Sequence, residues 1–243
     1  MRIIVADTPH AMGEEAARLA EEILCRAIRE RGRARLAVST GASQMDALAA
    51  LTRRAIPWQQ VELFQIAERL GQETIGSGRR ALRDRLARKL PLMRVHYLDA
   101  SGENMNRLGK ELRKQPMDLL LTGIGDQGQI GFNAAPADFE ADEAYIRIPA
   151  GEGDGVVTMS IREMMRSRHV IACAPYAIHA ENVRRLIRYP LTPDIPATAL
   201  KRHAELDLLL DRESAGKISV QMAADHNPSL TVYRIMYETE QEE

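Results

Sequence analysis

Short apolar runs alternate along the chain with longer segments in which apolar residues recur every three or four positions. The first longer segment runs from His10 to Arg31 and has one apolar face, which predicts an amphipathic helix that begins near Pro9 and ends at Gly32. Further helical segments are predicted after Gln44 and at 75–90, 104–114, 161–167, 177–187 and 196–201.

The apolar runs between these segments are too short for helices. They predict strands at 2–6, 35–39, 61–66, 94–98, 117–122, 145–148, 156–160, 169–174, 206–210 and 229–236. Strands that alternate with helices across short connections indicate an α/β protein with a parallel sheet sandwiched by helices. We also expect a loop at 67–71, a mobile turn-rich insertion at 151–155 and a disordered acidic tail at 238–243. No linker or repeat interrupts the pattern, so a single domain over residues 1–243 is expected.

The charges of the chain nearly cancel, with 33 basic and 34 acidic residues among 243. This balance gives no support for binding to nucleic acid or membranes, and no apolar run is long enough to span a bilayer. Cys25 and Cys173 stand far apart without zinc-ligand spacing, which fits a reducing, cytoplasmic setting. The histidines show no metal-ligand pairing either, so no metal or cofactor is expected. The sequence leaves open whether the chain forms a homo-oligomer.

A glycine-rich stretch follows the apolar run at 117–122. It contains four glycines interleaved with polar residues: Gly123, Gly125, Asp126, Gln127, Gly128, Gln129, Gly131 and Asn133. Glycine permits close approach of the backbone to a ligand, and ligands bind at the carboxyl ends of strands in open α/β sheets. The stretch therefore predicts a loop that wraps a small molecule. The alternative is a loop that needs its glycines only to turn.

A second candidate loop runs from Ser39 to Gln44, between a predicted strand and a predicted helix. Its free backbone N–H groups, the positive end of the helix dipole and its hydroxyl groups together favour an anion site. The loop lacks the glycine and lysine pattern of a nucleotide-binding P-loop. The alternative is that Ser43 only caps the helix.

Four stretches agree with the motifs of one family. STGASQM at 39–45 resembles a phosphate-loop pattern, VELFQIAERLG at 61–71 resembles VxxFxxDEYxG, and GIGDQGQIGFNAAP at 123–136 resembles GIGxDGHIGFNEP. Residues 156–187 and 196–203 resemble the C-terminal signature of the same family. The sequence is therefore similar to the glucosamine-6-phosphate isomerase/deaminase family, which is related to the 6-phosphogluconolactonases, and its GFN ending favours the deaminase side.

This resemblance implies a three-layer, Rossmann-like α/β domain with a mostly parallel sheet and a site formed by these loops. Known members bind phosphorylated sugars and convert an aldose amine to a ketose with loss of ammonia. By this resemblance, a phosphorylated sugar is the expected partner, and its expected contacts are Ser39, Thr40, Gly41, Ala42, Ser43, Gly125, Gly128, Asn133 and His179.

The catalytic positions implied by the resemblance carry other residues. Ala67 stands where the family has its proton-abstracting aspartate, although the neighbouring Glu68 is kept. Gln127 and Gln129 replace the catalytic aspartate and histidine of the glycine-rich loop, and Ala134 replaces a glutamate. Alanine and glutamine do not titrate, whereas each general acid or base typically contributes ~10²–10⁴-fold to the rate. We therefore expect little or no glucosamine-6-phosphate deamination.

Two classes of function remain open. In the first, the protein is a non-catalytic sugar-phosphate binder or sensor, and Gln127 and Gln129 hydrogen-bond sugar hydroxyl groups. In the second, it is an enzyme with altered chemistry, such as a sugar-phosphate isomerase or a lactonase-like hydrolase, that uses Glu68, Asp126 or His179 as its acid or base.

Glu68 and His179 each have a structural alternative as well. Adjacent residues of an extended segment face opposite sides, so Glu68 is expected to point away from Gln127 and Gln129, toward Arg69 or the basic helix at 79–88. His179 aligns near the phosphate-binding lysine of the family, and its alternative is an exposed position on the surface of a helix.

Overall fold

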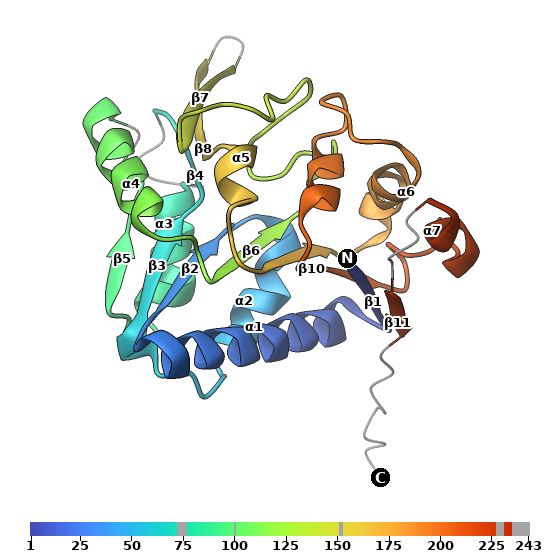
Figure 1. The fold of residues 1–243 in the computed structure, drawn as a ribbon, viewed down its shortest axis with the longest axis horizontal. Coiled ribbons are helices and arrows are strands. Elements are labelled where there is room, and N and C mark those ends of the chain that lie inside the picture. The colour runs from blue at the N-terminus through green and yellow to red at the C-terminus, as the bar shows by residue number, and fades with distance from the viewer. Residues whose placement is uncertain (72–76, 100, 151–152, 227–230, 235–243) are drawn as a thin grey trace.

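The centre of the fold is a sheet of eight parallel strands. The computed structural model describes residues 1–71, 77–99, 101–150, 153–226 and 231–234, and within them the strand order is β11-β1-β10-β9-β6-β2-β3-β5 (Figure 1). Every neighbouring pair in this sheet is parallel. Its members are β1 (Arg2–Ala6), β2 (Ala34–Val38), β3 (Val61–Gln65), β5 (Arg94–His96), β6 (Leu119–Gly123), β9 (Val170–Ala174), β10 (Leu206–Asp211) and β11 (Thr231–Arg234).

Alternate side chains of the strands face opposite sides of the sheet and build two separate cores. Leu119 and Leu121 of β6 belong to one buried cluster, and Leu120 belongs to the other. Both faces are therefore covered, and the predicted three-layer α/β fold is confirmed. The first cluster packs under α1 (Pro9–Arg31), α2 (Met45–Leu51) and α3 (Gly78–Leu82), and the second under α4 (Gly102–Lys114), α5 (Ile161–Met164), α6 (Ala180–Arg188) and α7 (Val220–His226).

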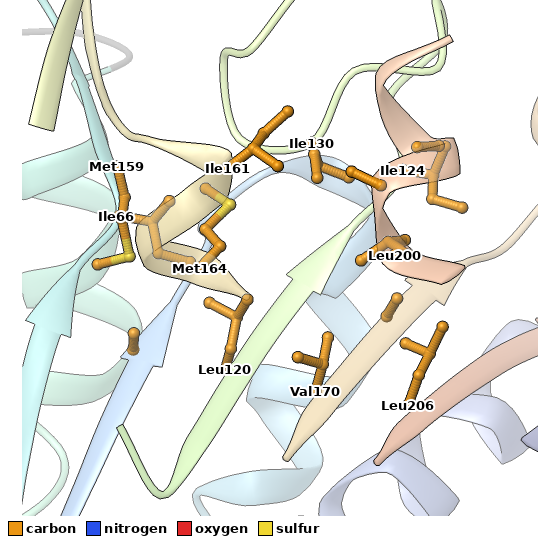
Figure 2. Close-up of a cluster of buried hydrophobic side chains, with 14 of the residues drawn as sticks. Ile66, Leu120, Ile124, Ile130, Met159, Ile161, Met164, Val170, Leu200 and Leu206 are labelled. Carbon is orange, nitrogen blue, oxygen red and sulfur yellow. The ribbon is translucent and has the colours of Figure 1, made fainter. Parts of the chain in front are cut away.

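Figure 2 shows part of the second core, on one face of the central strands. Leu120, Val170 and Leu206 stand on three neighbouring strands, β6, β9 and β10, and point toward the same layer of side chains. Met164 of α5 and Leu200 of the helical turn η5 (Pro196–Arg202) close this layer. Ile124 and Ile130 of the glycine-rich loop belong to the same core, so the packing holds the loop that follows β6.

Helix α1 is bounded by the residues that the sequence indicated. The Thr8 hydroxyl accepts a hydrogen bond from the backbone N–H of Ala11 at 3.1 Å, and Pro9 is the first helical residue. Gly32 ends the helix with φ at 74°, a left-handed conformation that glycine adopts without strain. The apolar face between these caps packs on the sheet, as predicted.

A small antiparallel sheet lies over the carboxyl ends of the parallel strands and corrects two predictions. It pairs β4 (Ala67–Arg69) with β8 (Gly153–Met159), and β8 with β7 (Tyr145–Ala150). The predicted loop at 67–71 is thus partly a strand, because its partner lies some 90 residues further on, at Val156 to Thr158. The predicted mobile insertion at 151–155 is also wrong for residues 153–155, which belong to β8, while residues 151–152 lie outside the described residues.

The remaining differences are local. Residues 75–76 of the predicted helix at 75–90 lie outside the described residues, and the rest contains α3 and a π-helical turn η3 (Arg83–Ala87). Helix α7 was not predicted. The acidic tail at 238–243 lies outside the described residues. Among the described residues, no helix combines the length and apolar character needed to cross a membrane. Short helical turns complete the fold: η1 (Ala42–Gln44), η2 (Trp58–Gln60) and η4 (Ala177–His179).

Candidate functional site

A cavity of about 610 Å³ lies at the carboxyl ends of the parallel strands β2, β3 and β6. This is the end of an open α/β sheet at which ligands bind. Three segments that are distant in sequence form its walls: the loop after β2, the loop after β6, and the stretch from β4 to η3. Its polar and charged lining residues are Ser39, Thr40, Ser43, Gln44, Arg69, Ser77, Arg80, Asp84, Arg85, Asp126 and Gln129.

The loop from Ser39 to Ser43, where an anion site is expected, forms one wall of the cavity. All five of its residues line the cavity. The first hydrogen bond of η1 runs from the Gln44 N–H to the Gly41 carbonyl at 3.2 Å, so the N–H groups of Ala42 and Ser43 have no acceptor within that helical turn. Neither η1 nor α2 has a side-chain cap, which rules out the alternative that Ser43 serves as the cap.

Three arginines face this loop across the cavity. Arg85 donates a hydrogen bond from Nη1 to the Thr40 carbonyl at 3.1 Å, and Arg69 lies over the Phe132 ring, 5.0 Å from its centroid. Arg80 lies 3.6 Å from Asp84, measured between Nε and Oδ2. None of the three arginines was among the predicted ligand contacts. The signal was present in the basic segment at 75–90, but helical spacing alone does not say which side faces a cavity.

Glu68 does not line the cavity. Its carboxylate is buried and accepts hydrogen bonds from the backbone N–H groups of Arg69 (2.9 Å), Gly78 (2.8 Å) and Arg79 (2.6 Å), and from the side chain of Gln65 (2.9 Å). The expected direction, toward Arg69 and the basic helix, is confirmed. Ala67, one residue earlier, lines the cavity instead. The suggestion that Glu68 contacts a ligand as acid or base has no geometric support.

The two glutamines of the glycine-rich loop differ in position. Gln129 lines the cavity, and its Oε1 accepts a hydrogen bond from the backbone N–H of Gln127 at 2.9 Å. Gln127 itself is exposed and is not part of the lining. Gly125 lines the cavity, whereas Gly128 lies behind it with φ at 77°. The positive φ of Gly128 agrees with the alternative that this glycine serves the turn.

Asn133, which the resemblance implies as a ligand contact, is not part of the cavity lining. Its side chain is 1% exposed and donates from Nδ2 to the carbonyls of Ile130 (2.9 Å) and Met159 (3.0 Å). These bonds fasten the end of the glycine-rich loop to β8. Asn133 shapes the cavity only indirectly, through the backbone that it holds.

His179 is buried beneath the Ser39–Ser43 loop, so its interpretation as an exposed helix residue is wrong. Its Nε2 lies 3.5 Å from the Ser43 hydroxyl and 3.9 Å from Oδ1 of Asp126. Burial lowers the pKa of His179 below 6.5, although the carboxylates of Asp126 and Asp211 act in the opposite direction. The imidazole is not part of the cavity lining and supports the loop from behind.

Gln44, the last residue of the predicted loop, closes the floor of the cavity and was not among the expected ligand contacts. Its side chain is 1% exposed, and its Nε2 has no hydrogen-bond partner among the described residues. A Cβ placed on Gly123 would lie 1.7 Å from this nitrogen, and one on Gly41 would lie 3.3 Å from Oε1. The absence of side chains at Gly41 and Gly123 therefore creates the space that the amide fills.

The chain matches the family described as glucosamine-6-phosphate isomerases/6-phosphogluconolactonase over residues 7–209. It belongs to this family. A glucosamine-6-phosphate deaminase of Bacillus cereus strain G9842 is 25% identical over 252 residues, which cover 96% of this chain and 95% of the relative. The deaminase of Bacillus thuringiensis strain Al Hakam is 24% identical over the same shares.

Solved structures agree on the fold. A monomeric glucosamine-6-phosphate deaminase aligns with a TM-score of 0.80 at 21% identity, covering 90% of this chain and all of that one. The 6-phosphogluconolactonase of Thermotoga maritima aligns with a TM-score of 0.76 at 17% identity, covering 87% and 99%. The family and the fold suggested by the sequence motifs are thus both confirmed.

Among the described residues, no group of three or more His, Cys, Asp and Glu is placed to hold a metal ion.

Proposed function

We propose that this protein binds a phosphorylated sugar in the cavity of about 610 Å³ and does not deaminate glucosamine 6-phosphate. The observation that carries the proposal is the arrangement of the Ser39–Ser43 loop opposite Arg69, Arg80 and Arg85 around one space. Guanidinium groups and backbone N–H groups at a helical turn are both donors suited to phosphate. A cavity of this volume accepts a ligand of hexose-phosphate size.

The proposed orientation puts the phosphate at the Ser39–Ser43 loop and the sugar beside the glycine-rich loop. A Cβ on Gly125 would lie 2.2 Å from Nε2 of Gln129, so the glycine makes room for this amide at the cavity wall. The Gln129 amide can both donate and accept hydrogen bonds to sugar hydroxyl groups. Asp126, on the same loop, supplies acceptor oxygens only. This set of groups can hold a polyol by hydrogen bonding without moving a proton between its carbons.

The lack of deamination rests on the substituted family positions. Ala67 lines the cavity where the resemblance implies a proton-abstracting aspartate, and a methyl group cannot take up a proton. Gln129 lines it where the resemblance implies a histidine. Of the three residues considered as replacement acids or bases, Glu68 and His179 lie outside the lining and only Asp126 lies on it. An isomerase or lactonase-like hydrolase is the alternative, and it would depend on Asp126.

We further propose a role in carbohydrate metabolism in the cytoplasm. The named relatives act on glucosamine 6-phosphate, which supports the first part. Cys25 and Cys173 are both free thiols, which supports a reducing compartment.

Two measurements test the proposal. Thermal unfolding is followed during titration with glucosamine 6-phosphate and fructose 6-phosphate, and a ligand at ~100 times its dissociation constant should stabilise the native state by roughly 2.7 kcal/mol. No shift with any hexose phosphate at millimolar concentration rejects the binding. Ammonia release from glucosamine 6-phosphate is then assayed. A turnover of about 10 s⁻¹, which is typical of enzymes, rejects the proposal that the protein does not deaminate this sugar. Turnover of another hexose phosphate that is lost in Asp126→Asn supports the alternative enzyme.

A further inference from the structure

A second cavity, of about 440 Å³, lies at the β5 edge of the sheet, between β5, α4 and the first turn of α3. It shares no lining residue with the cavity of the proposed sugar-phosphate site. We propose that it binds the phosphate group of a small phosphorylated metabolite, as a second anion site independent of the first.

Three arginines from three different elements line this second cavity: Arg79 of α3, Arg94 of β5 and Arg107 of α4. Among the residues that the structure describes, none of these guanidinium groups lies within 4.0 Å of a carboxylate oxygen. By contrast, the half-buried Arg18 and Arg184 each approach a carboxylate to 2.7 Å or less. The three charges at the second cavity therefore remain available to an anion.

The two acidic residues of the cavity wall are already engaged. Glu111 accepts a hydrogen bond from Nζ of Lys114 at 2.6 Å. Asp99 accepts two, from the backbone N–H and the hydroxyl of Ser101, at 2.9 and 2.8 Å. Three guanidinium groups line the space against these two carboxylates, so an excess of positive charge remains.

The walls are held in place by contacts that need no ligand. The Arg79 guanidinium lies 5.1 Å from the centroid of the Tyr97 ring. Asn104 is buried and bonds from Nδ2 to the Tyr97 carbonyl at 3.3 Å, while its Oδ1 accepts from the Asp99 N–H at 3.2 Å. His96 forms the floor and stacks on Phe64, with 4.1 Å between ring centroids. A preformed wall reduces the ordering cost of binding.

Phosphate is the ligand chemistry that fits these groups. The guanidinium fork pairs with two phosphate oxygens at once, and three forks around a concave space can surround one phosphate. The volume is that of a small-molecule site. A polynucleotide fits less well, because a strand that runs beyond the arginines would meet Asp99 and Glu111, and the chain has a net charge of -1.

The test is an NMR titration of the 15N-labelled protein with inorganic phosphate at constant ionic strength. The Asn104 side-chain amide reports on the second cavity, and the Thr40 and Gly41 amides report on the first. The double variant Arg94→Gln/Arg107→Gln is compared with Arg33→Gln, which removes an exposed arginine that lines neither cavity. Thermal midpoints confirm that each variant is folded.

We expect the Asn104 signal to saturate with phosphate in the wild type and in Arg33→Gln, and to need at least about tenfold more phosphate in the double variant. The response of Thr40 and Gly41 should be the same in all three proteins. An Asn104 signal that does not move, or that moves alike in all three proteins, overturns the proposal. So does a single-stranded RNA that shifts Asn104 and is not displaced by phosphate. Because the two cavities are read separately, failure of the first site leaves this result intact.

Discussion

The carboxylate of Glu68 accepts a hydrogen bond from the backbone N–H of Gly78 at 2.8 Å and so joins β4 to the start of α3. The N–H of Arg79 adds a second bond at 2.6 Å. The segment that begins here carries Arg80 and Arg85 to the cavity. Glu68 thus positions two lining residues without itself reaching a ligand.

Replacing Glu68 by Gln should lower the free energy of unfolding by roughly 1.5–3 kcal/mol, because charge-assisted hydrogen bonds to backbone N–H groups are lost. Hexose-phosphate binding should stay within a few-fold of wild type. Urea denaturation and calorimetric titration measure the two quantities. Glu213→Gln, at an exposed position, is the matched control, with an expected change below about 0.5 kcal/mol. A folded Glu68→Gln protein that has lost a measurable turnover would contradict this assignment.

Arg85→Gln should weaken hexose-phosphate binding by about tenfold or more, since a guanidinium near the Thr40 carbonyl is replaced by a neutral amide. Calorimetric titration with fructose 6-phosphate measures the change. Arg33→Gln removes the same charge from a position outside the cavity and should leave the affinity unchanged. Equal losses in the two variants would indicate a general charge effect in place of a phosphate contact.

Gly123→Ala should destabilise the protein by roughly 1–3 kcal/mol, because the added methyl group would lie 1.7 Å from Nε2 of Gln44 and 3.0 Å from the Cys173 carbonyl. The first contact is with the end of a flexible side chain, so Gln44→Ala should remove it. We therefore expect the double variant Gly123→Ala/Gln44→Ala to recover part of the loss. Strictly additive effects of the two substitutions in urea denaturation would show that the amide does not fill the floor.

Stability should fall as the pH drops below about 6.5, because burial lowers the pKa of His179 below that ordinary value. Between the two pKa values the unfolded chain holds the extra proton, so the contribution of His179 is complete above the unfolded pKa and is lost on acidification. A fully titrating group changes stability by about 1.4 kcal/mol per pH unit.

Urea denaturation between pH 8 and pH 5 measures this dependence. His179→Gln should give a shallower curve, and the remaining slope should come from groups that include His96 and His169, whose pKa values burial also lowers. Superimposable curves for wild type and variant would mean that the imidazole of His179 is not desolvated.

Restoring the catalytic residues that the resemblance implies should restore chemistry only in combination. Ala67→Asp alone should release no ammonia from glucosamine 6-phosphate, because ring opening would still lack its histidine and carboxylates. The combination of Ala67→Asp, Gln127→Asp, Gln129→His and Ala134→Glu should give a detectable rate in a coupled ammonia assay. Activity in the single variant, or in the wild type, would refute the view that these four positions limit the reaction.

The sequence predicted the layers and the loop from Ser39 to Ser43 because both depend on local patterns. A buried strand, a glycine-containing turn and a helix start follow each other there within a few residues, and strand order does not affect what they form. The same holds for α1, because its caps, Thr8 and Gly32, directly precede and follow the helix in the sequence.

Side-chain direction within the loops could not be predicted in the same way. Gln127, Gly128 and Asn133 stand in the right loop but face away from the cavity, because β8 and the Ile195 region determine how that loop turns. Arg80 and Arg85 reach the cavity through the bonds that Glu68 makes with α3. These positions depend on contacts between segments that are distant in sequence. The spacing of hydrophobic residues along the chain does not reveal such contacts.

Strand β1, near the amino end of the chain, is paired with β10 on one side and β11 on the other. During synthesis it therefore emerges with both edges open and finds no neighbour in the sheet until residues 206–211 and 231–234 exist. By contrast, β2, β3, β5 and β6 can pair among themselves once residue 123 has been made. The residues that line the first cavity therefore lie beside strands that can pair early, whereas the sheet is complete only once β10 and β11 have paired with β1.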